Sequence, residues 1–139
     1  MISTTAGLTE DRSAIRSDMA DDLNQRSYEV VFHNETGHPL MLVSACHGAE
    51  DAWMLTPPPT VAAGETVTFK VRSARRAAGG VVIYRDAVRG GLVTFCGSAS
   101  ARPGGSCCYS TPTDGLLVVG PQGCVPGVQA HVHGTYVLG

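Results

Sequence analysis

The sequence predicts an all-β protein: an antiparallel β-sandwich of about eight strands with one short N-terminal helix. Short extended runs recur at intervals of about ten residues from residue 28 onward, as in sandwiches and small barrels. The chain also contains 17 glycines and 8 prolines, which favour turns. Strand and helix patterns do not alternate, so a parallel sheet is not expected. The same pattern leaves one alternative, a small closed β-barrel with a helical lid.

The chain divides into two regions, and its length of 139 residues suits one folded core. Residues 9–25 place three apolar side chains at successive steps of four residues, which predicts one amphipathic helix. The apolar stripe of this helix is narrow, so residues 1–26 are interpreted as a helical or flexible N-terminal extension. Residues 27–139 are expected to form the β-sandwich domain.

The first two strands are expected on either side of a turn rich in Asn, Gly and Pro. In residues 28–34, Tyr28, Val30 and Phe32 share one face of an alternating pattern. Residues 40–45 resume an extended run that is apolar on both faces. Together the two runs predict a first hairpin.

The later strands follow the same period of two. In residues 66–72, Val67, Phe69 and Val71 are expected to face inward. Residues 127–139 alternate over their whole length and predict a long closing strand. Runs bounded by Gly, Pro, Asp or Ser predict four more strands, at residues 81–85, 90–96, 106–110 and 115–120.

The single tryptophan, Trp53, precedes three successive prolines in the stretch TPPPT, residues 56–60. Proline donates no ladder hydrogen bond, so this stretch is expected to cross between sheets or to run along an edge. Trp53 can then close the end of the sandwich. The same geometry also places an aromatic ring at the rim of a binding face.

The charge and the apolar stretches of the sequence limit the classes of partner to be expected. Residues 27–139 carry seven acids and seven bases, so the domain lacks the positive field that retains nucleic acid. No stretch reaches the roughly 20 apolar residues of a spanning helix, so any membrane contact is expected to be peripheral. The N-terminal residues contain no apolar core typical of a signal peptide. We therefore expect a cytoplasmic protein, or one released without a conventional signal peptide.

The five cysteines form an odd set without a C-x-x-C pair, which argues against a disulfide framework and against a structural zinc site. In a reducing compartment all five are expected as free thiols. The adjacent pair is expected to point to opposite faces of a strand. The cysteines are Cys46, Cys96, Cys107, Cys108 and Cys124.

The order of motifs over roughly residues 28–95 resembles the aegerolysins and their hemolysin-like relatives. The resemblance rests on VVFHNETGHPLML, on Gly48 and Trp53 before PPPTVAAGETVTFKV, and on AAGGVVIY, where a glycine pair opens a strand ending at Tyr84. It implies a small β-sandwich that recognises membrane lipids, often sphingolipid headgroups, in some cases with a larger partner protein that forms the pore. A partner protein or a homodimer stays open for this chain.

The expected ligand is a lipid headgroup or a similar small amphipathic molecule, bound without catalysis. The resemblance assigns recognition to Trp53 and nearby loop residues. Guanidinium groups could hold a phosphate or sulfate group by forked hydrogen bonds, although arginines at strand ends are more often solvated surface. The candidate ligand-binding residues are Trp53, Tyr84, Arg75, Arg76 and Arg85.

Other chemistry receives weaker support from the sequence. His131 and His133 share one face of a strand and could bind a metal with a third ligand, but exposed histidines on a polar face are the plainer interpretation. Cys46 and His47 are neighbours in a strand and point away from each other, so no catalytic mechanism is named and catalysis stays open. No cofactor is expected. Two alternatives remain: a small β-barrel enzyme or apolar-ligand carrier of secondary metabolism with the helix as lid, and a lectin-like sugar binder.

Overall fold

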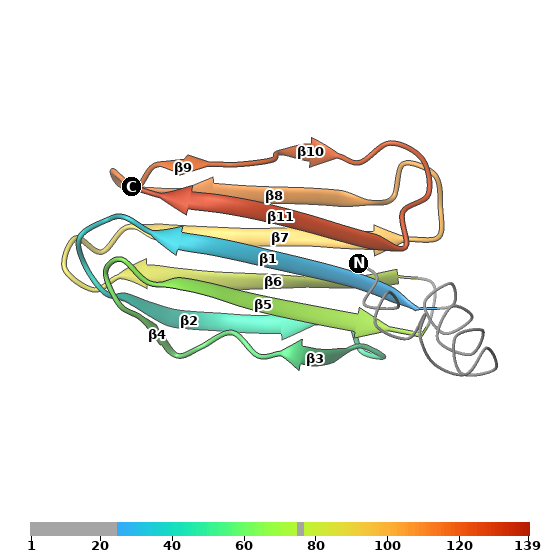
Figure 1. Ribbon diagram of the computed structural model, residues 1–139, viewed down its shortest axis with the longest axis horizontal. Helices are drawn as coiled ribbons and strands as arrows, with labels where there is room; N and C mark the ends of the chain where they lie inside the picture. The colour runs from blue at the N-terminus through green and yellow to red at the C-terminus, as the bar shows by residue number, and fades with distance from the viewer. Residues whose placement is uncertain (1–24, 75–76) are drawn as a thin grey trace, which may run out of the picture.

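The computed structural model describes residues 25–74 and 77–139, which form two β-sheets packed face to face (Figure 1). This part of the chain contains eleven strands and no helix. Both sheets are open, so the predicted sandwich is confirmed and the closed barrel is not. The predicted N-terminal helix lies outside the described residues. No helix among the described residues has the length and hydropathy to cross a membrane.

The first sheet has the strand order β3-β5-β1-β11-β9. Strand β1 lies at its centre and pairs antiparallel with β5 but parallel with β11. The expectation of a purely antiparallel sandwich is therefore wrong at this one pair, because the first and last long strands run side by side in the same direction. The strands are β3 (Ala52–Leu55), β5 (Thr66–Ser73), β1 (Arg26–Asn34), β11 (His131–Leu138) and β9 (Val118–Val119).

The second sheet has the order β10-β8-β7-β6-β2-β4 and every pairing in it is antiparallel. Its long central strands form a meander in which β6, β7 and β8 follow one another in the chain. The strands are β10 (Gly123–Cys124), β8 (Cys107–Pro112), β7 (Leu92–Ser100), β6 (Ala77–Asp86), β2 (Leu40–His47) and β4 (Thr60–Val61).

The predicted first hairpin does not form, because β1 and β2 belong to different sheets. The buried side chain of Asn34 explains the arch between them. Its amide nitrogen donates hydrogen bonds to the carbonyl of His38 at 2.8 Å and that of Val61 at 3.3 Å, and its oxygen accepts from the Thr36 hydroxyl at 2.6 Å. The side-chain amide of this one asparagine thus ties the arch to β4.

The proline stretch crosses between the sheets, as the sequence predicts. Strand β3 belongs to the first sheet and β4 to the second, and the prolines connect them. Pro57 is buried. The Pro58 carbonyl accepts a hydrogen bond from the hydroxyl of Tyr84 at 2.7 Å, which fastens the crossing segment to β6.

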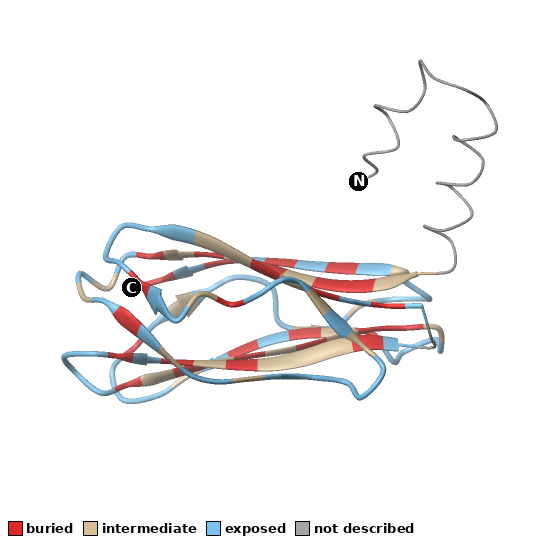
Figure 2. Cartoon of the chain, turned by 90° about the horizontal axis from the view of Figure 1, so that it is seen from below, coloured by how far each residue is buried: buried red, intermediate tan, exposed pale blue. Residues whose placement is uncertain are grey.

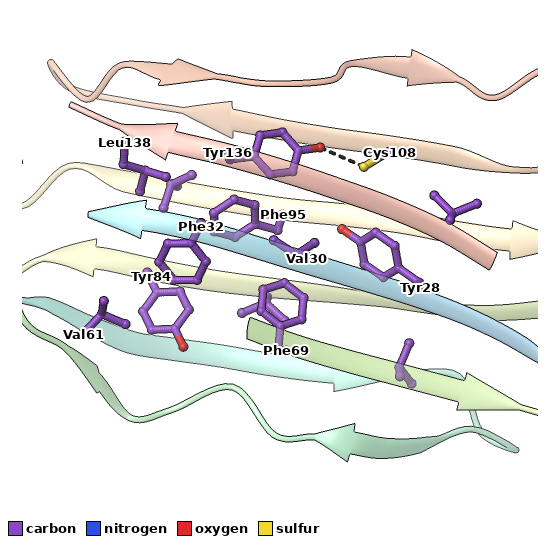
Figure 3. Close-up of a cluster of buried hydrophobic side chains, with 14 of the residues drawn as sticks. Tyr28, Val30, Phe32, Val61, Phe69, Tyr84, Phe95, Cys108, Tyr136 and Leu138 are labelled. Carbon is purple, nitrogen blue, oxygen red and sulfur yellow. Dashed lines mark hydrogen bonds between the residues drawn. The ribbon is translucent and has the colours of Figure 1, made fainter. Parts of the chain in front are cut away.

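The core lies between the sheets (Figure 2), and buried residues alternate with exposed ones along β11 and with half-buried ones along most of β1 and β7. Tyr28, Val30 and Phe32 are fully buried, as predicted. Aromatic rings dominate the centre (Figure 3): the ring centroids of Phe32 and Phe95 lie 4.9 Å apart, and those of Phe95 and Tyr136 lie 5.4 Å apart. These contacts join rings of the first sheet to a ring of the second.

Candidate functional site

Trp53 lies on β3, the edge strand of the first sheet, and is half-buried. Its ring meets the Phe69 ring edge-on, with centroids 6.2 Å apart, and meets the His47 ring in the same way at 5.5 Å. A Cβ atom placed on Gly80 would lie 3.7 Å from the far end of the indole. Trp53 therefore spans from the core of the first sheet to β2 and β6 of the second and closes the open side of the sandwich.

Exposed apolar side chains lie on the strands next to Trp53. Met41 and Val43 on β2 are 38% and 54% exposed, and Met54 and Leu55 on β3 are 48% and 47% exposed. The chain passes from β2 through β3 to β4 along this one edge of the sandwich (Figure 1). We call Met41, Val43, Trp53, Met54 and Leu55 the β2–β3 edge.

Two register shifts fall within this edge. Val43 has no partner on β6, because the pairing of β2 slips between Leu42 and Ser44. Met54 likewise has no partner on β5, because the pairing of β3 slips beyond Trp53. Met41, Val43 and Met54 face outward by ordinary alternation with Leu40, Leu42 and Trp53. The bulge after Trp53 breaks that alternation, so that Leu55 is exposed as well.

The sequence-predicted residues Arg85 and Tyr84 lie on opposite faces of β6. Arg85 is exposed, and it is the register partner of Met41, so its guanidinium group belongs beside the β2–β3 edge. Tyr84 is fully buried. Burial, with Glu65 nearby, raises the pKa of Tyr84, so its phenol stays protonated and donates to Pro58. Tyr84 thus supports the crossing segment, and its ring offers no outer surface in this conformation.

Two other ligand-binding candidates, Arg75 and Arg76, fall outside the described residues. The metal-ligand candidates His131 and His133 lie on β11. His131 Nδ1 lies 2.7 Å from the Ser27 hydroxyl, and His133 Nδ1 lies 2.8 Å from a carboxylate oxygen of Glu29. Among the described residues no group of three His, Cys, Asp or Glu side chains is arranged to hold a metal ion.

A surface groove adjoins Trp53, and the sequence did not indicate it. His47, Asp51 and Gly80 contribute to its lining, together with Arg26 and Cys96. The Asp51 carboxylate shapes one wall, since its Oδ2 accepts hydrogen bonds from the backbone amides of Gly48 and Gly79 at 3.2 and 3.0 Å. The loop between β2 and β3 is thereby held against β6.

Comparison with known proteins gives a likeness of fold alone. No family model and no curated protein sequence matches this chain. Among solved structures, the crystal structure of the lipid binding protein Nakanori is similar, with a TM-score of 0.64 and 12% sequence identity, over 97% of this chain and 85% of that one. At this identity the chain shares the fold of a lipid-binding protein, and the expected aegerolysin membership is not shown by it.

Proposed function

We propose that the protein binds amphipathic surfaces, namely membrane lipid headgroups with the adjoining apolar boundary, through the β2–β3 edge and without catalysis. The observation that carries the proposal is the half-buried Trp53 flanked on one edge by four exposed apolar side chains, Met41, Val43, Met54 and Leu55. Soluble proteins expose single apolar residues routinely, whereas apolar residues gathered beside an aromatic ring mark an interaction surface.

The chemistry of this edge suits the boundary between headgroups and acyl chains. Tryptophan prefers this boundary because its ring is apolar while its indole N–H finds a polar partner. Arg85, beside Met41, supplies a cation within reach of a phosphate group, and no ion pair with a described residue neutralises it. Because Trp53 packs on Phe69, the edge is ordered before a ligand arrives, which lowers the entropic cost of binding.

The shared fold supports the class of ligand. Nakanori is described as a lipid binding protein, and the present chain follows its backbone over most of its length. For this chain the proposed ligand is a phosphate-bearing lipid headgroup at a membrane surface. Trp53 and Arg85 are the proposed contacts, and Tyr84 is a positioning residue for the proline crossing.

The test is sedimentation of the protein with vesicles of phosphatidylcholine, with and without sphingomyelin or an anionic phospholipid. The double variant Met54→Asp/Leu55→Asp should reduce the bound fraction by about tenfold or more, because it removes two apolar side chains from the contact. Val128→Asp is the matched control, since Val128 is 50% exposed and lies outside the edge. Equal loss in the control, or no binding of the wild type to any vesicle, would contradict the proposal.

A further inference from the structure

Four of the five cysteines lie on strands of the second sheet with their thiols on its outer face. Cys108 is the exception: it is 3% exposed, points inward and lies 2.8 Å from the Tyr136 hydroxyl (Figure 3). The outward thiols are exposed or half-buried, and they belong to β2, β7, β8 and β10. They are Cys46, Cys96, Cys107 and Cys124.

Cys107 and Cys124 face each other directly across the pair formed by β8 and β10. The next hydrogen bond of this ladder runs from the amide of Val125 to the carbonyl of Ser106 at 2.9 Å. In an antiparallel pair the hydrogen-bonded and non-hydrogen-bonded positions alternate, so Cys107 and Cys124 occupy a non-hydrogen-bonded position. Cα atoms at such positions lie about 4.5 Å apart, which falls inside the range that a disulfide spans.

The other outward thiols are less well placed. Cys96 is the register partner of Tyr109, and Cys107 is that of Ser98, so Cys96 and Cys107 are only diagonal neighbours. Diagonal Cα atoms are about 7 to 8 Å apart, at or beyond the limit for a disulfide without backbone movement. Cys46 is separated from Cys96 by the whole of β6. By strand register, Cys107 and Cys124 are thus the outward pair whose backbone positions best suit a disulfide.

We propose that Cys107 and Cys124 form a reversible disulfide when the protein meets a small-molecule disulfide such as oxidised glutathione. The exposed Cys124 thiolate attacks one sulfur of the oxidant and displaces one thiol. The Cys107 thiolate then attacks Cys124 Sγ in the mixed disulfide and displaces the second thiol. Two protein thiols are oxidised, the oxidant is reduced to two thiols, and the two protons pass to these leaving groups.

The local environment supports this order of attack. Cys124 is exposed and Cys107 is half-buried, so the oxidant reaches Cys124 first. Burial, with Cys96 and Cys124 nearby, raises the pKa of Cys107, which keeps this thiol mostly protonated and makes it a poor first nucleophile. The second step should therefore accelerate as the pH rises.

The bond would fasten a weakly held edge. Strand β10 has two residues and β8 is its sole neighbour in the sheet, at the border of the molecule (Figure 1). A disulfide there closes the chain segment that contains β9 and thereby restricts the unfolded state. In a reducing compartment both thiols stay free, and the bond forms when the protein enters an oxidising one. This inference does not depend on lipid binding.

The experiment exposes the folded protein to buffers of increasing oxidised-to-reduced glutathione ratio and counts thiols by mass. The expected product has lost two hydrogens and keeps three thiols that react once the protein is denatured. Proteolysis before Asp114, which lies between the two cysteines, should give two fragments joined by a reducible bond. The oxidised protein should also melt about 5 °C or more above the reduced one.

Single serine variants identify the pair. Cys107→Ser and Cys124→Ser should each abolish the joined fragments, while the matched controls Cys46→Ser and Cys96→Ser should keep them. Thermal melting in reductant confirms that each variant is folded. The proposal is overturned if Cys107→Ser still yields the joined fragments, if glutathione adducts accumulate on Cys124 without ring closure, or if oxidation leaves the melting temperature unchanged.

Discussion

At the scale of single residues, the three buried tyrosines differ in how their hydroxyl groups are satisfied. Tyr84 donates to the Pro58 carbonyl, and Tyr136 donates to the Pro121 carbonyl at 2.8 Å. The Tyr28 hydroxyl is buried and has no hydrogen-bond partner among the described residues. A buried polar group without a partner costs free energy, whereas a paired one contributes about 1 kcal/mol. The rings are therefore equivalent as core residues but not as hydrogen-bonding groups.

Replacing each of these tyrosines with phenylalanine should separate the two cases. Tyr84→Phe and Tyr136→Phe should each lower the free energy of unfolding by about 1 to 2 kcal/mol, because a carbonyl loses its donor. Tyr28→Phe should be neutral or stabilising, since it removes an unpaired hydroxyl and keeps the ring. Urea denaturation of the three variants provides the comparison. A loss at Tyr28→Phe as large as at the other two sites would show that its hydroxyl is paired.

Asp86 makes stability depend on acid pH. Burial alone would raise the pKa of its carboxyl, but hydrogen bonds from the amides of Arg89 and Val88 at 2.9 and 2.8 Å, together with His38, hold that pKa below its ordinary value. The contribution of the carboxylate to stability is thus complete above the unfolded pKa of about 3.9 and is lost as the pH falls through the lower folded value.

The Asp86→Asn variant should test this dependence. At pH 7 it should be less stable than the wild type by about 1 to 3 kcal/mol, because a charged acceptor of several hydrogen bonds is removed. Below about pH 4 the difference should shrink, since the wild-type carboxyl becomes protonated as the pH falls. Thermal or urea unfolding at pH 7 and at pH 2 to 3 gives both values. A difference independent of pH would contradict the assignment.

At the scale of strands, the large rings of the core rest on glycines of facing or neighbouring segments. A Cβ atom on Gly97 of β7 would approach the Tyr28 ring of β1 to well within contact distance, and one on Gly120 would do the same to Tyr136. The absence of a side chain at Gly97 therefore lets β1 and β7, from different sheets, pack closely around a tyrosine. Strand glycines of this kind mark close approach rather than a turn.

Gly97→Ala should lower the free energy of unfolding by about 2 to 3 kcal/mol, because the added methyl group overpacks the core against Tyr28. In a Tyr28→Leu background the same substitution should cost less than about 1 kcal/mol, since the ring is gone. Urea denaturation of the four proteins of this cycle measures the coupling. An equal cost in both backgrounds would show that the added methyl group clashes with a residue other than Tyr28.

The sequence predicted the strands better than their partners. Alternation identified β1, β5 and β11 together with their inward residues, because a half-buried strand shows a period of two. Strand β11 is shorter than expected and begins at His131. The parallel pairing of β1 with β11 and the crossing of β1 to β2 were not predictable, since pairing over long sequence separations leaves no local signal. The short strands β3, β4 and β10 were missed for a different reason: two to four residues are too few to show a period.

The candidate site was predictable in part. Trp53 stood out as a single aromatic residue beside three prolines, and its half-buried position suits both roles that the sequence left open. Met41, Val43, Met54 and Leu55 did not stand out, because their exposure depends on which strands form the edge and, for Leu55, on a bulge. The sequence indicated Tyr84 as a ligand-binding candidate, but Tyr84 lies on the inward face of β6 and is fully buried.

At the scale of the whole molecule, the described core joins residues of both sheets and Leu116 of the loop before β9. Its buried residues run from Tyr28 on β1 to Leu138 on β11, and both lie in the central region of the first sheet. The chain is thus closed by pairing its first long strand with its last. Pairing between strands so distant in sequence forms slowly and cooperatively, so the domain should unfold as one unit.

Deletion of residues 1–24 should leave a protein that melts in one cooperative transition, because the described strands from β1 onward already bury a large core between two sheets. Circular dichroism and thermal melting of the shortened chain measure this directly. A molten or insoluble product would show that the deleted residues cover part of the core.

The most direct test of lipid recognition uses the fluorescence of Trp53, which is the single tryptophan of the chain and therefore reports one site. Titration with phosphate-bearing lipid vesicles should shift its emission to shorter wavelength as the indole leaves water, and the shift should disappear in Met54→Asp/Leu55→Asp but persist in Val128→Asp. Sedimentation of the same samples reports binding independently. Protein that sediments with vesicles while its emission stays unchanged, or that fails to sediment with every lipid tested, would contradict binding through the β2–β3 edge.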